Sequence, residues 1–84
     1  MDFAGAVITP HAALQMIKRQ IARERLKAIL AKPDEVRNVR PGRVVLHGLD
    51  GQRLLRVFVD VDRDPPAVVT VYRTSQVKKY WRKP

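Results

Sequence analysis

The sequence contains no cysteine, and its apolar runs are short. The absence of cysteine excludes disulfide frameworks, cysteine-ligated zinc sites and thiol nucleophiles. A helix that crosses a bilayer needs roughly 18 or more apolar residues in a row, and no run in this chain approaches that length. The opening Met1-Asp2-Phe3 has neither the basic start nor the apolar stretch of a signal peptide. We therefore expect a soluble, cytoplasmic protein.

Acidic residues are also scarce, with 8 Asp and Glu against 17 Lys and Arg, which gives a formal net charge of +9. A basic excess of this size favours a polyanionic partner such as RNA, DNA, an acidic protein or an anionic membrane surface. Membrane adsorption would require the basic residues to lie opposite the apolar face of a helix, whereas here they are scattered along the chain. Nucleic acid is therefore the favoured partner, and an acidic protein is the second.

The length of 84 residues and the 45% hydrophobic content predict one small domain over residues 1–84. Thr9 and Pro10 form a helix start, because Thr is a good N-cap and Pro suits the first helical position. The following residues carry two apolar stripes about 135° apart on a helix: Leu14, Ile17 and Ile21, and then Ala22, Leu26, Ile29 and Leu30. One straight helix cannot bury both stripes, so we expect helices over 10–19 and 22–31 with a break near Gln20.

The second half of the chain has the β-branched content and turn residues of strands. Strands are predicted over 43–48, 52–61 and 67–73, after a polar connection over 34–42 that ends in a Pro-Gly turn. Residues 1–8 fit either an edge strand or a loose lead-in. The predicted fold class is α+β, with two N-terminal helices packed on one face of a three- to four-stranded twisted antiparallel sheet. A basic, aromatic C-terminal segment follows over 74–84.

Asp50-Gly51 is a strong signal for a two-residue hairpin loop, which fixes the strand register. That register pairs His47 with Leu54 and divides the sheet into an aliphatic face and a second face of mixed composition. We call the second face the mixed face. Its members are Arg43, Val45, His47, Leu54, Arg56, Phe58 and Asp60, joined by Val68, Thr70 and Tyr72 from the last strand. The helices should cover the aliphatic face and leave the mixed face available to a polyanion.

Two short motifs carry a family resemblance. Thr9-Pro10-His11-Ala12 opens the first helix, and Val69-Thr70-Val71-Tyr72-Arg73-Thr74-Ser75 runs into Lys78-Lys79-Tyr80-Trp81. Over residues 9–81 the chain resembles a small bacterial family of uncharacterised domains in the RelE-like, or barnase–EndoU–colicin–RelE, group of ribonuclease toxins. The resemblance implies metal-free RNA cleavage on the sheet face opposite the helices, and an antitoxin that masks the site. Relatives usually have glycine where Gln20 stands here, which puts the shape of that turn in doubt.

The resemblance and the chemistry of RNA cleavage together nominate the site residues. The expected catalytic residues are His11, Tyr72, Arg73, Lys79 and Tyr80. The expected nucleic-acid contacts are Arg43, His47, Arg56, Thr70, Thr74, Lys78, Trp81 and Arg82. Histidine can transfer protons near neutral pH, and Arg and Lys can stabilise the developing phosphorane charge. No cofactor or metal is expected. The prediction of a metal-independent endoribonuclease requires His11 to converge with the late tyrosines and Arg73 on one concave patch.

Several other readings of the same residues stay open. A first-turn histidine such as His11 is most often a plain surface residue, and the basic tail is most often a solvated chain end. The acidic run Asp60-Val61-Asp62-Arg63-Asp64 has alternate carboxylates, but a charged strand end explains it better than a Mg²⁺ site. The whole chain also fits a non-catalytic RNA- or DNA-binding module, or an adaptor for an acidic, antitoxin-like protein. An exposed edge strand would permit a homodimer.

Overall fold

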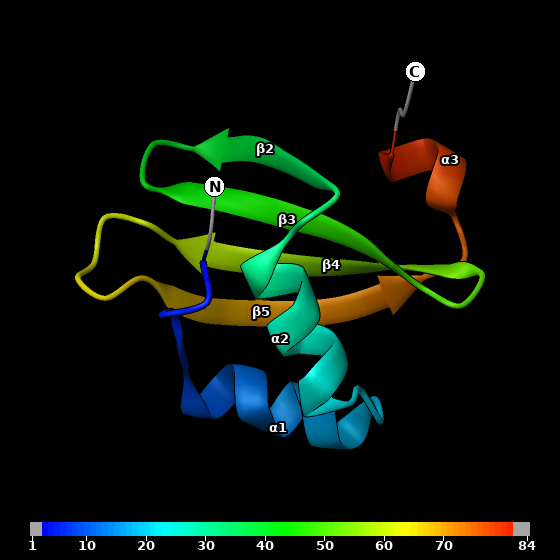
Figure 1. Cartoon of the computed structure of the whole chain (residues 1–84), viewed down its shortest axis with the longest axis horizontal. Coiled ribbons are helices and arrows are strands. Elements are labelled where there is room, and N and C mark those ends of the chain that lie inside the picture. Colours follow the sequence, from blue (N-terminus) through cyan, green and yellow to red (C-terminus); the bar gives the residue numbers. More distant parts are fainter. Residues whose placement is uncertain (1–2, 82–84) are drawn as a thin grey trace.

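The computed structural model describes residues 3–81 and forms a small α+β fold with one mixed sheet (Figure 1). Within this range the strands are β1 (Val7–Ile8), β2 (Glu35–Arg40), β3 (Arg43–Asp50), β4 (Arg53–Asp60) and β5 (Ala67–Thr74). The helices are α1 (Pro10–Lys18), α2 (Arg23–Ala31) and α3 (Val77–Tyr80). The strands lie in the order β1-β5-β4-β3-β2, so the three consecutive strands β3, β4 and β5 form the centre of the sheet and β1 and β2 form its edges.

The predicted three- to four-stranded antiparallel sheet is wrong, because the sheet has five strands in residues 3–81 and one parallel pair. The extra strand β2 falls in the segment expected to be a polar connection. Five of its six residues are exposed, so this edge strand lacks the alternation of apolar residues that marks a half-buried strand. Strand β1 pairs parallel with β5 over only two residues, Val7 with Ala67 and Ile8 with Val68.

The two helices expected from the N-terminal pattern are present, each within one residue of its predicted ends. The N–H of Ala12 donates to Thr9 Oγ1 at 3.2 Å, which makes Thr9 the N-cap of α1. Gln20 lies in the left-handed region with φ of 54°. A helix commonly ends on such a residue, usually glycine, and the chain changes direction here before α2 begins.

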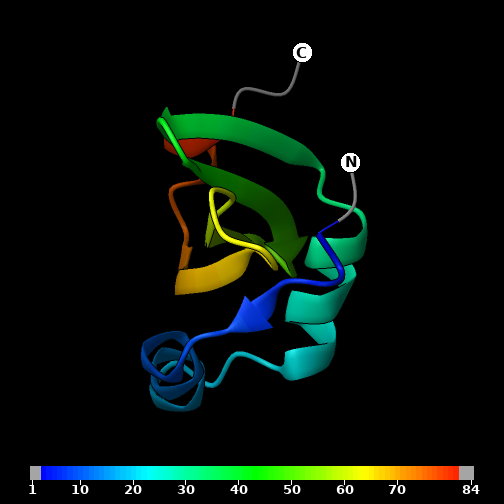
Figure 2. The same cartoon turned by 90° about the vertical axis from the view of Figure 1, so that its left-hand side faces the viewer.

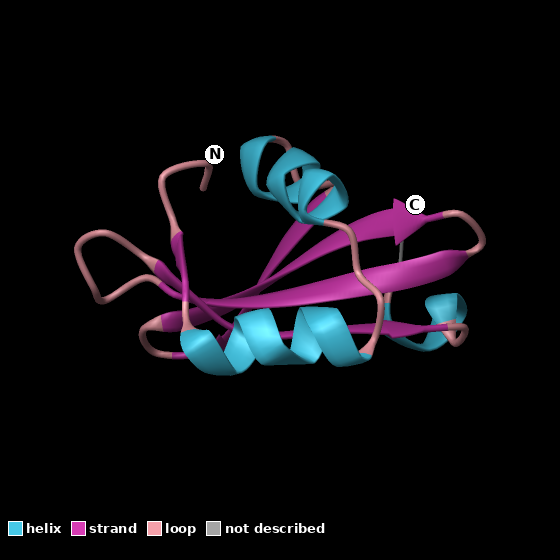
Figure 3. Ribbon diagram, turned by 90° about the horizontal axis from the view of Figure 1, so that it is seen from below, coloured by secondary structure: helices cyan, strands magenta, loops and turns pink. Residues whose placement is uncertain are grey.

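The helices do not form one layer, which corrects the expectation that both pack on the same face. α2 crosses one face of the sheet, whereas α1 runs along the outer edge of β5 and α3 lies on the opposite face (Figures 2 and 3). Gln15 Oε1 accepts from the N–H of Val71 at 3.1 Å, and Arg19 Nη1 donates to the carbonyl of Val71 at 3.1 Å. Side chains of α1 thus satisfy backbone groups of β5 that the two-residue strand β1 does not reach.

The register of the β3–β4 hairpin differs from the prediction by two residues. Asp50 pairs with Arg53 and His47 pairs with Arg56, so the loop is Gly51-Gln52. Gly51 has a positive φ of 66° and Gln52 does not, as a type II′ turn requires. Because side chains alternate with a period of two, a two-residue shift leaves every side chain of β3 and β4 on its predicted face.

A bulge in β5 changes one member of the mixed face. Thr70 pairs with Phe58, and Val68 pairs with Val59, so Val69 is an extra residue between them. Val68 therefore joins the apolar core, while Thr70 and Tyr72 remain on the mixed face. This corrects the expectation for Val68 alone.

The main core lies between the sheet, α2, α1 and the N-terminal segment. Its fully buried members include Leu26, Leu46, Leu55, Val57 and Val59. None of the helices in residues 3–81 has the length and apolar content to span a membrane.

Candidate nucleic-acid interface on the mixed face

Arg56 stands at the centre of the mixed face because β4 is the middle strand of the sheet. It pairs in register with His47 on β3 and with Tyr72 on β5. Its Nε–H donates to His47 Nε2 at 3.1 Å, and its Nη1–H donates to the Tyr72 hydroxyl oxygen at 2.5 Å. The guanidinium is therefore held from both neighbouring strands and cannot turn freely.

Aromatic rings surround the same guanidinium. The Cζ atom of Arg56 lies 4.0 Å from the centroid of the Tyr80 ring, 5.2 Å from that of Phe58 and 5.6 Å from that of Tyr72. Phe58 and Tyr72 are stacked, with centroids 6.1 Å apart and planes inclined by 16°. All four side chains are half-buried. A cation flanked by rings is suited to stacking on nucleobases and to holding a phosphate.

His47 is fully buried, which differs from its expected role as a nucleic-acid contact. Its Nδ1 lies 2.7 Å from Glu35 Oε1, and Glu35 Oε2 also lies 3.2 Å from Arg37 Nε. Burial lowers the pKa of His47 below its ordinary value, and the charges of Arg56 and Arg37 add to this effect against the opposing influence of Glu35. The imidazole is therefore neutral at physiological pH and is enclosed by its neighbours.

The C-terminal segment brings one more expected residue to Arg56. Thr74 Oγ1 accepts from the N–H of Gln76 at 3.0 Å, which turns the chain from β5 into α3. This turn carries Tyr80 onto Arg56, and Lys79 Nζ lies 5.3 Å from the centroid of the Tyr80 ring. Lys78 and Lys79 are exposed, and Trp81 is half-buried. The expected contact Arg82 lies outside the described residues.

Arg73 does not join the mixed face, which corrects its expected place beside Tyr72. It follows Tyr72 in β5 and so points to the other side of the sheet. Its guanidinium donates to the carbonyl of Arg19 and, at 3.3 Å, to that of Gln20, where α1 ends. It also lies 3.5 Å from Asp50. Arg73 therefore caps the helix C-terminus, where a cation is favourable.

His11 also lies apart from the tyrosines, so the expected convergence does not occur. The N–H of Thr9 donates to the carbonyl of Val68 at 3.1 Å, which places the start of α1 beside the beginning of β5. The end of α1 lies beside Arg73. Eight residue steps separate His11 from Arg19, which corresponds to about 12 Å along the helix axis, and His11 is exposed at the end of α1 remote from Arg73.

Arg43 is on the mixed face, but an acidic neighbour neutralises its charge. Its guanidinium donates to both carboxylate oxygens of Asp60, at 2.6 and 3.3 Å. The hydrogen bond from Arg43 lowers the pKa of Asp60. Asp60 is thereby committed to an ion pair, and residues 3–81 contain no cluster of three side chains suited to a metal ion.

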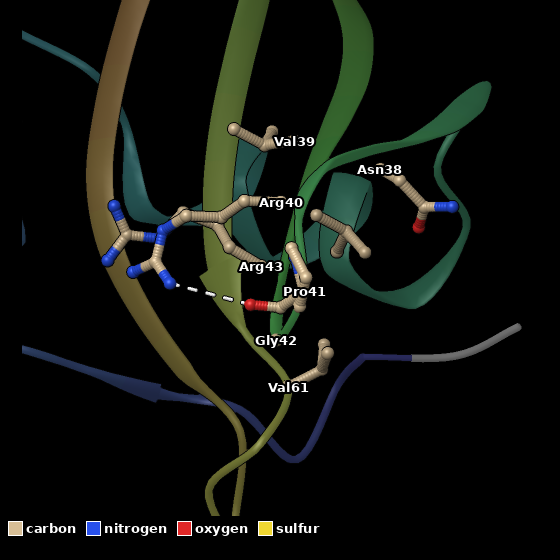
Figure 4. A pocket seen from close by; sticks show the side chains of 8 residues that line it. Asn38, Val39, Arg40, Pro41, Gly42, Arg43 and Val61 are labelled. Atoms are coloured by element: carbon tan, nitrogen blue, oxygen red, sulfur yellow. Dashed lines mark hydrogen bonds between the residues drawn. The ribbon is translucent and has the colours of Figure 1, made fainter.

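A pocket lies away from Arg56, at the turn between β2 and β3 (Figure 4). Its volume is about 380 Å³. Apolar and cationic side chains line it together, and Arg40 Nη1 donates to the carbonyl of Pro41 at 3.4 Å. This turn and α3 lie at opposite ends of the sheet (Figure 1). The pocket is therefore separate from the Arg56 cluster, which consists of Arg56 and the side chains linked to it: Glu35, His47, Phe58, Tyr72 and Tyr80.

Two residues of the Arg56 cluster, Glu35 and Phe58, are not among the site residues expected from the sequence. Phe58 was placed on the mixed face but was not chosen as a contact. Glu35 fell in the segment interpreted as a connection. The Pro41-Gly42 turn permits a second hairpin, but its two-residue loop alone would place Val36 opposite His47. The register shift between Asn38 and Arg40 brings Glu35 to that position, and no sequence pattern indicates this shift.

The comparisons with known proteins give a family and no activity. Neither the curated proteins nor the solved structures include a match to this chain. One family model, described as a domain of unknown function (DUF4258), matches residues 8–73. Because this match covers most of the chain, the protein belongs to the DUF4258 family.

Proposed function

We propose that this protein binds single-stranded RNA on the mixed face and cleaves it there without a metal ion, as an endoribonuclease of toxin type. The observation that carries the proposal is the pairing of Arg56 with Tyr72 across 2.5 Å. The guanidinium supplies the positive charge that stabilises a phosphorane. The 2′-oxygen attacks the phosphorus as the bond from phosphorus to the 5′-oxygen breaks, and the 2′-hydroxyl proton passes to solvent water. The hydrogen bond from Arg56 uses a lone pair of the phenol oxygen, so the Tyr72 O–H can donate a proton to the leaving 5′-oxygen and is reprotonated from solvent.

The aromatic rings support binding of unpaired rather than duplex RNA. Phe58, Tyr72 and Tyr80 surround Arg56, and bases of single-stranded RNA stack on such rings. Lys78 and Lys79 on α3 are exposed beside them and are suited to the flanking phosphates. The net charge of +9 favours the same ligand.

The sequence resemblance to RelE-like toxins supports the catalytic part of the proposal and implies its partners. An acidic, antitoxin-like protein would cover the mixed face, and the RNA would be free or ribosome-bound in the cytoplasm. Expression of the chain should then arrest growth, and co-expression of the acidic partner should restore it. His11 and Arg73 transfer no proton in this reaction. The Arg73 side chain points away from the mixed face toward Arg19, and His11 lies at the start of α1.

A non-catalytic RNA-binding module is the second candidate, and one observation favours it. Cleavage needs a base for the 2′-hydroxyl as well as an acid. Of the two imidazoles, His47 is fully buried and His11 lies at the far end of α1. The described part of the chain therefore offers no solvent-exposed imidazole beside Arg56.

The deciding experiment compares two variants of equal charge. Arg56→Gln removes the central guanidinium, and Arg53→Gln removes an exposed guanidinium on the other side of the same strand. Purified proteins are incubated with single-stranded RNA, tRNA and ribosome-bound mRNA in EDTA. Cleavage by wild type and Arg53→Gln but not by Arg56→Gln supports the nuclease. Salt-sensitive binding without strand scission selects the binding module. Wild type that neither binds nor cuts RNA overturns both.

A further inference from the structure

The contact between Arg56 and His47 fixes which nitrogen of the imidazole carries the proton. Arginine has five N–H donors and no acceptor. The 3.1 Å contact from Arg56 Nε is therefore a hydrogen bond only if His47 Nε2 carries no proton. In the neutral ring the proton then lies on Nδ1, which donates to Glu35 Oε1 at 2.7 Å. Both ring nitrogens thus have a partner of the right kind.

These bonds form one chain across four strands, from Glu35 on β2 through His47 and Arg56 to Tyr72 on β5. The exposed fraction of the His47 side chain is 0% and that of Glu35 is 20%. The enclosed members have no water to replace a lost partner, so each bond orients the next side chain. The guanidinium of Arg56 is consequently fixed at Nε, at Nη1 and on the face that Tyr80 covers.

We propose that His47 is a positioning residue for the RNA site: it holds the Arg56 guanidinium in place by accepting its Nε–H, and it releases that side chain when it becomes protonated. The role of the positioned Arg56 rests on the proposed function, whereas the hydrogen-bonded chain itself does not. His47 touches no substrate and acts only through Arg56.

The release follows from the groups that face the imidazole. Glu35 and Arg37 face it from β2 and Arg56 faces it from β4, while Tyr72 and Tyr80 face Arg56. A proton on Nε2 would point at the Nε–H of Arg56, so two donors would meet and two positive charges would adjoin. Glu35 favours the proton, but burial and the two guanidinium groups oppose it. Release should therefore occur below pH 6.5, the ordinary histidine value.

Two substitutions separate the bond to Arg56 from the bond to Glu35. In His47→Gln the longer side chain brings an amide oxygen near the former Nε2 position and can still accept from Arg56. In His47→Asn the shorter amide reaches only toward Glu35. Affinity for a single-stranded RNA oligonucleotide should fall about tenfold in His47→Asn, the value of one hydrogen bond to a charged group, and should change less than about threefold in His47→Gln.

The pH dependence of RNA affinity gives a readout that a purely structural role would not move. Falling pH adds positive charge and by itself strengthens RNA binding. Wild-type affinity should nevertheless fall at acidic pH, and His47→Gln should lack that fall. Equal pH profiles in wild type and His47→Gln would overturn the proposal, as would equal affinities in the two variants.

Nitrogen-15 NMR of the RNA-free protein tests the chain independently of any RNA activity. The expected spectrum has a protonated Nδ1 and an unprotonated Nε2 on His47, and an Arg56 Nε–H that exchanges slowly with water. A proton on Nε2 at neutral pH would overturn the positioning role even in a protein that binds RNA. If the protein shows the expected spectrum but does not bind RNA, the lack of binding refutes the proposed function, while the hydrogen bonds that position Arg56 are confirmed.

Discussion

Arg56 lies directly opposite Tyr72 in the β4–β5 ladder, and its guanidinium donates to the phenol oxygen at 2.5 Å. This relationship depends on strand register rather than on a loop. Sites built on strands hold their side chains more precisely than sites on loops. The bulge at Val69 contributes to it, because it moves Val68 into the core and leaves Thr70 and Tyr72 on the mixed face.

Replacement of Tyr72 by phenylalanine tests the assigned proton donor. Tyr72→Phe keeps the ring that stacks on Phe58 and removes only the hydroxyl. RNA cleavage should fall by about 100-fold or more, the usual value of a general acid. RNA affinity should fall by about tenfold at most, because the stacking ring remains and one of the two hydrogen bonds that orient Arg56 is lost. Single-turnover cleavage and equilibrium binding measure the two effects. Tyr80→Phe is the matched control, since the Tyr80 ring faces Arg56 and its hydroxyl has no assigned role; equal losses in both variants would contradict the assignment.

Removal of the Tyr80 ring tests the stacking surface. Tyr80→Ala should weaken binding of single-stranded RNA by about 5- to 150-fold, because a base stacked on an aromatic ring contributes about 1–3 kcal/mol. The dependence of affinity on salt should not change, since no charge is lost. Fluorescence anisotropy at several salt concentrations measures both quantities. An unchanged affinity would mean that the RNA does not stack on α3.

Substitution of Arg73 tests its reassignment from catalysis to helix capping. Arg73→Met removes the donors to the carbonyls of Arg19 and Gln20 and the contact with Asp50. The free energy of unfolding should fall by about 1–2 kcal/mol, as expected for a lost helix C-terminal cation and its hydrogen bonds. RNA affinity should fall only as much as that of Arg53→Met, which removes the same charge elsewhere. Chemical denaturation measures the stability and binding assays measure the affinity. If Arg73→Met loses more RNA affinity than Arg53→Met but no stability, Arg73 contacts the RNA directly and the capping role is wrong.

Stability should depend on pH through His47. The pKa of His47 is lower in the folded chain than in the unfolded chain, because burial opposes the charged form. Below pH 6.5 the unfolded state therefore binds more protons, and the free energy of unfolding falls as pH falls, by at most about 1.4 kcal/mol per pH unit for one proton. Denaturation of wild type and His47→Gln between pH 7.5 and about 5 measures this slope. The Arg43–Asp60 pair does not interfere, since Asp60 titrates below 3.8. If His47→Gln shows the same dependence of unfolding free energy on pH as wild type, another titrating group causes that dependence.

Local signals in the sequence predicted the N-terminal helices and the two faces of the central hairpin. The Thr9-Pro10 start and the two apolar stripes predicted the helix bounds closely. The faces of β3 and β4 were predicted correctly although the predicted loop begins one residue too early. Moving the loop by one residue changes each strand pairing by two residues, and a two-residue change keeps every side chain on the same face. Helix caps, apolar stripes and strand alternation depend on residues that are close in the sequence, so they can be recognised without knowing which distant segments are in contact.

The errors concern contacts between distant segments. An exposed edge strand such as β2 carries no alternating pattern, so the partner of His47 on that strand was not anticipated. The fully buried His47 is held between Glu35 and Arg56, which come from two different strands. The resemblance to ribonuclease toxins linked His11 and Arg73 with Tyr72, but side-chain direction in β5 and the placement of α1 along the sheet edge keep them apart.

The most direct test of the account is the location of bound RNA on the protein. Nitrogen-15 NMR spectra are recorded while a non-cleavable single-stranded oligonucleotide, with 2′-methoxy groups, is added to wild type. The account predicts shifts of the Arg56 Nε–H signal and of the backbone signals of Phe58, Tyr72 and Tyr80, with α2 unaffected. Shifts confined to the start of α1 around His11, or no shifts at all, would contradict it.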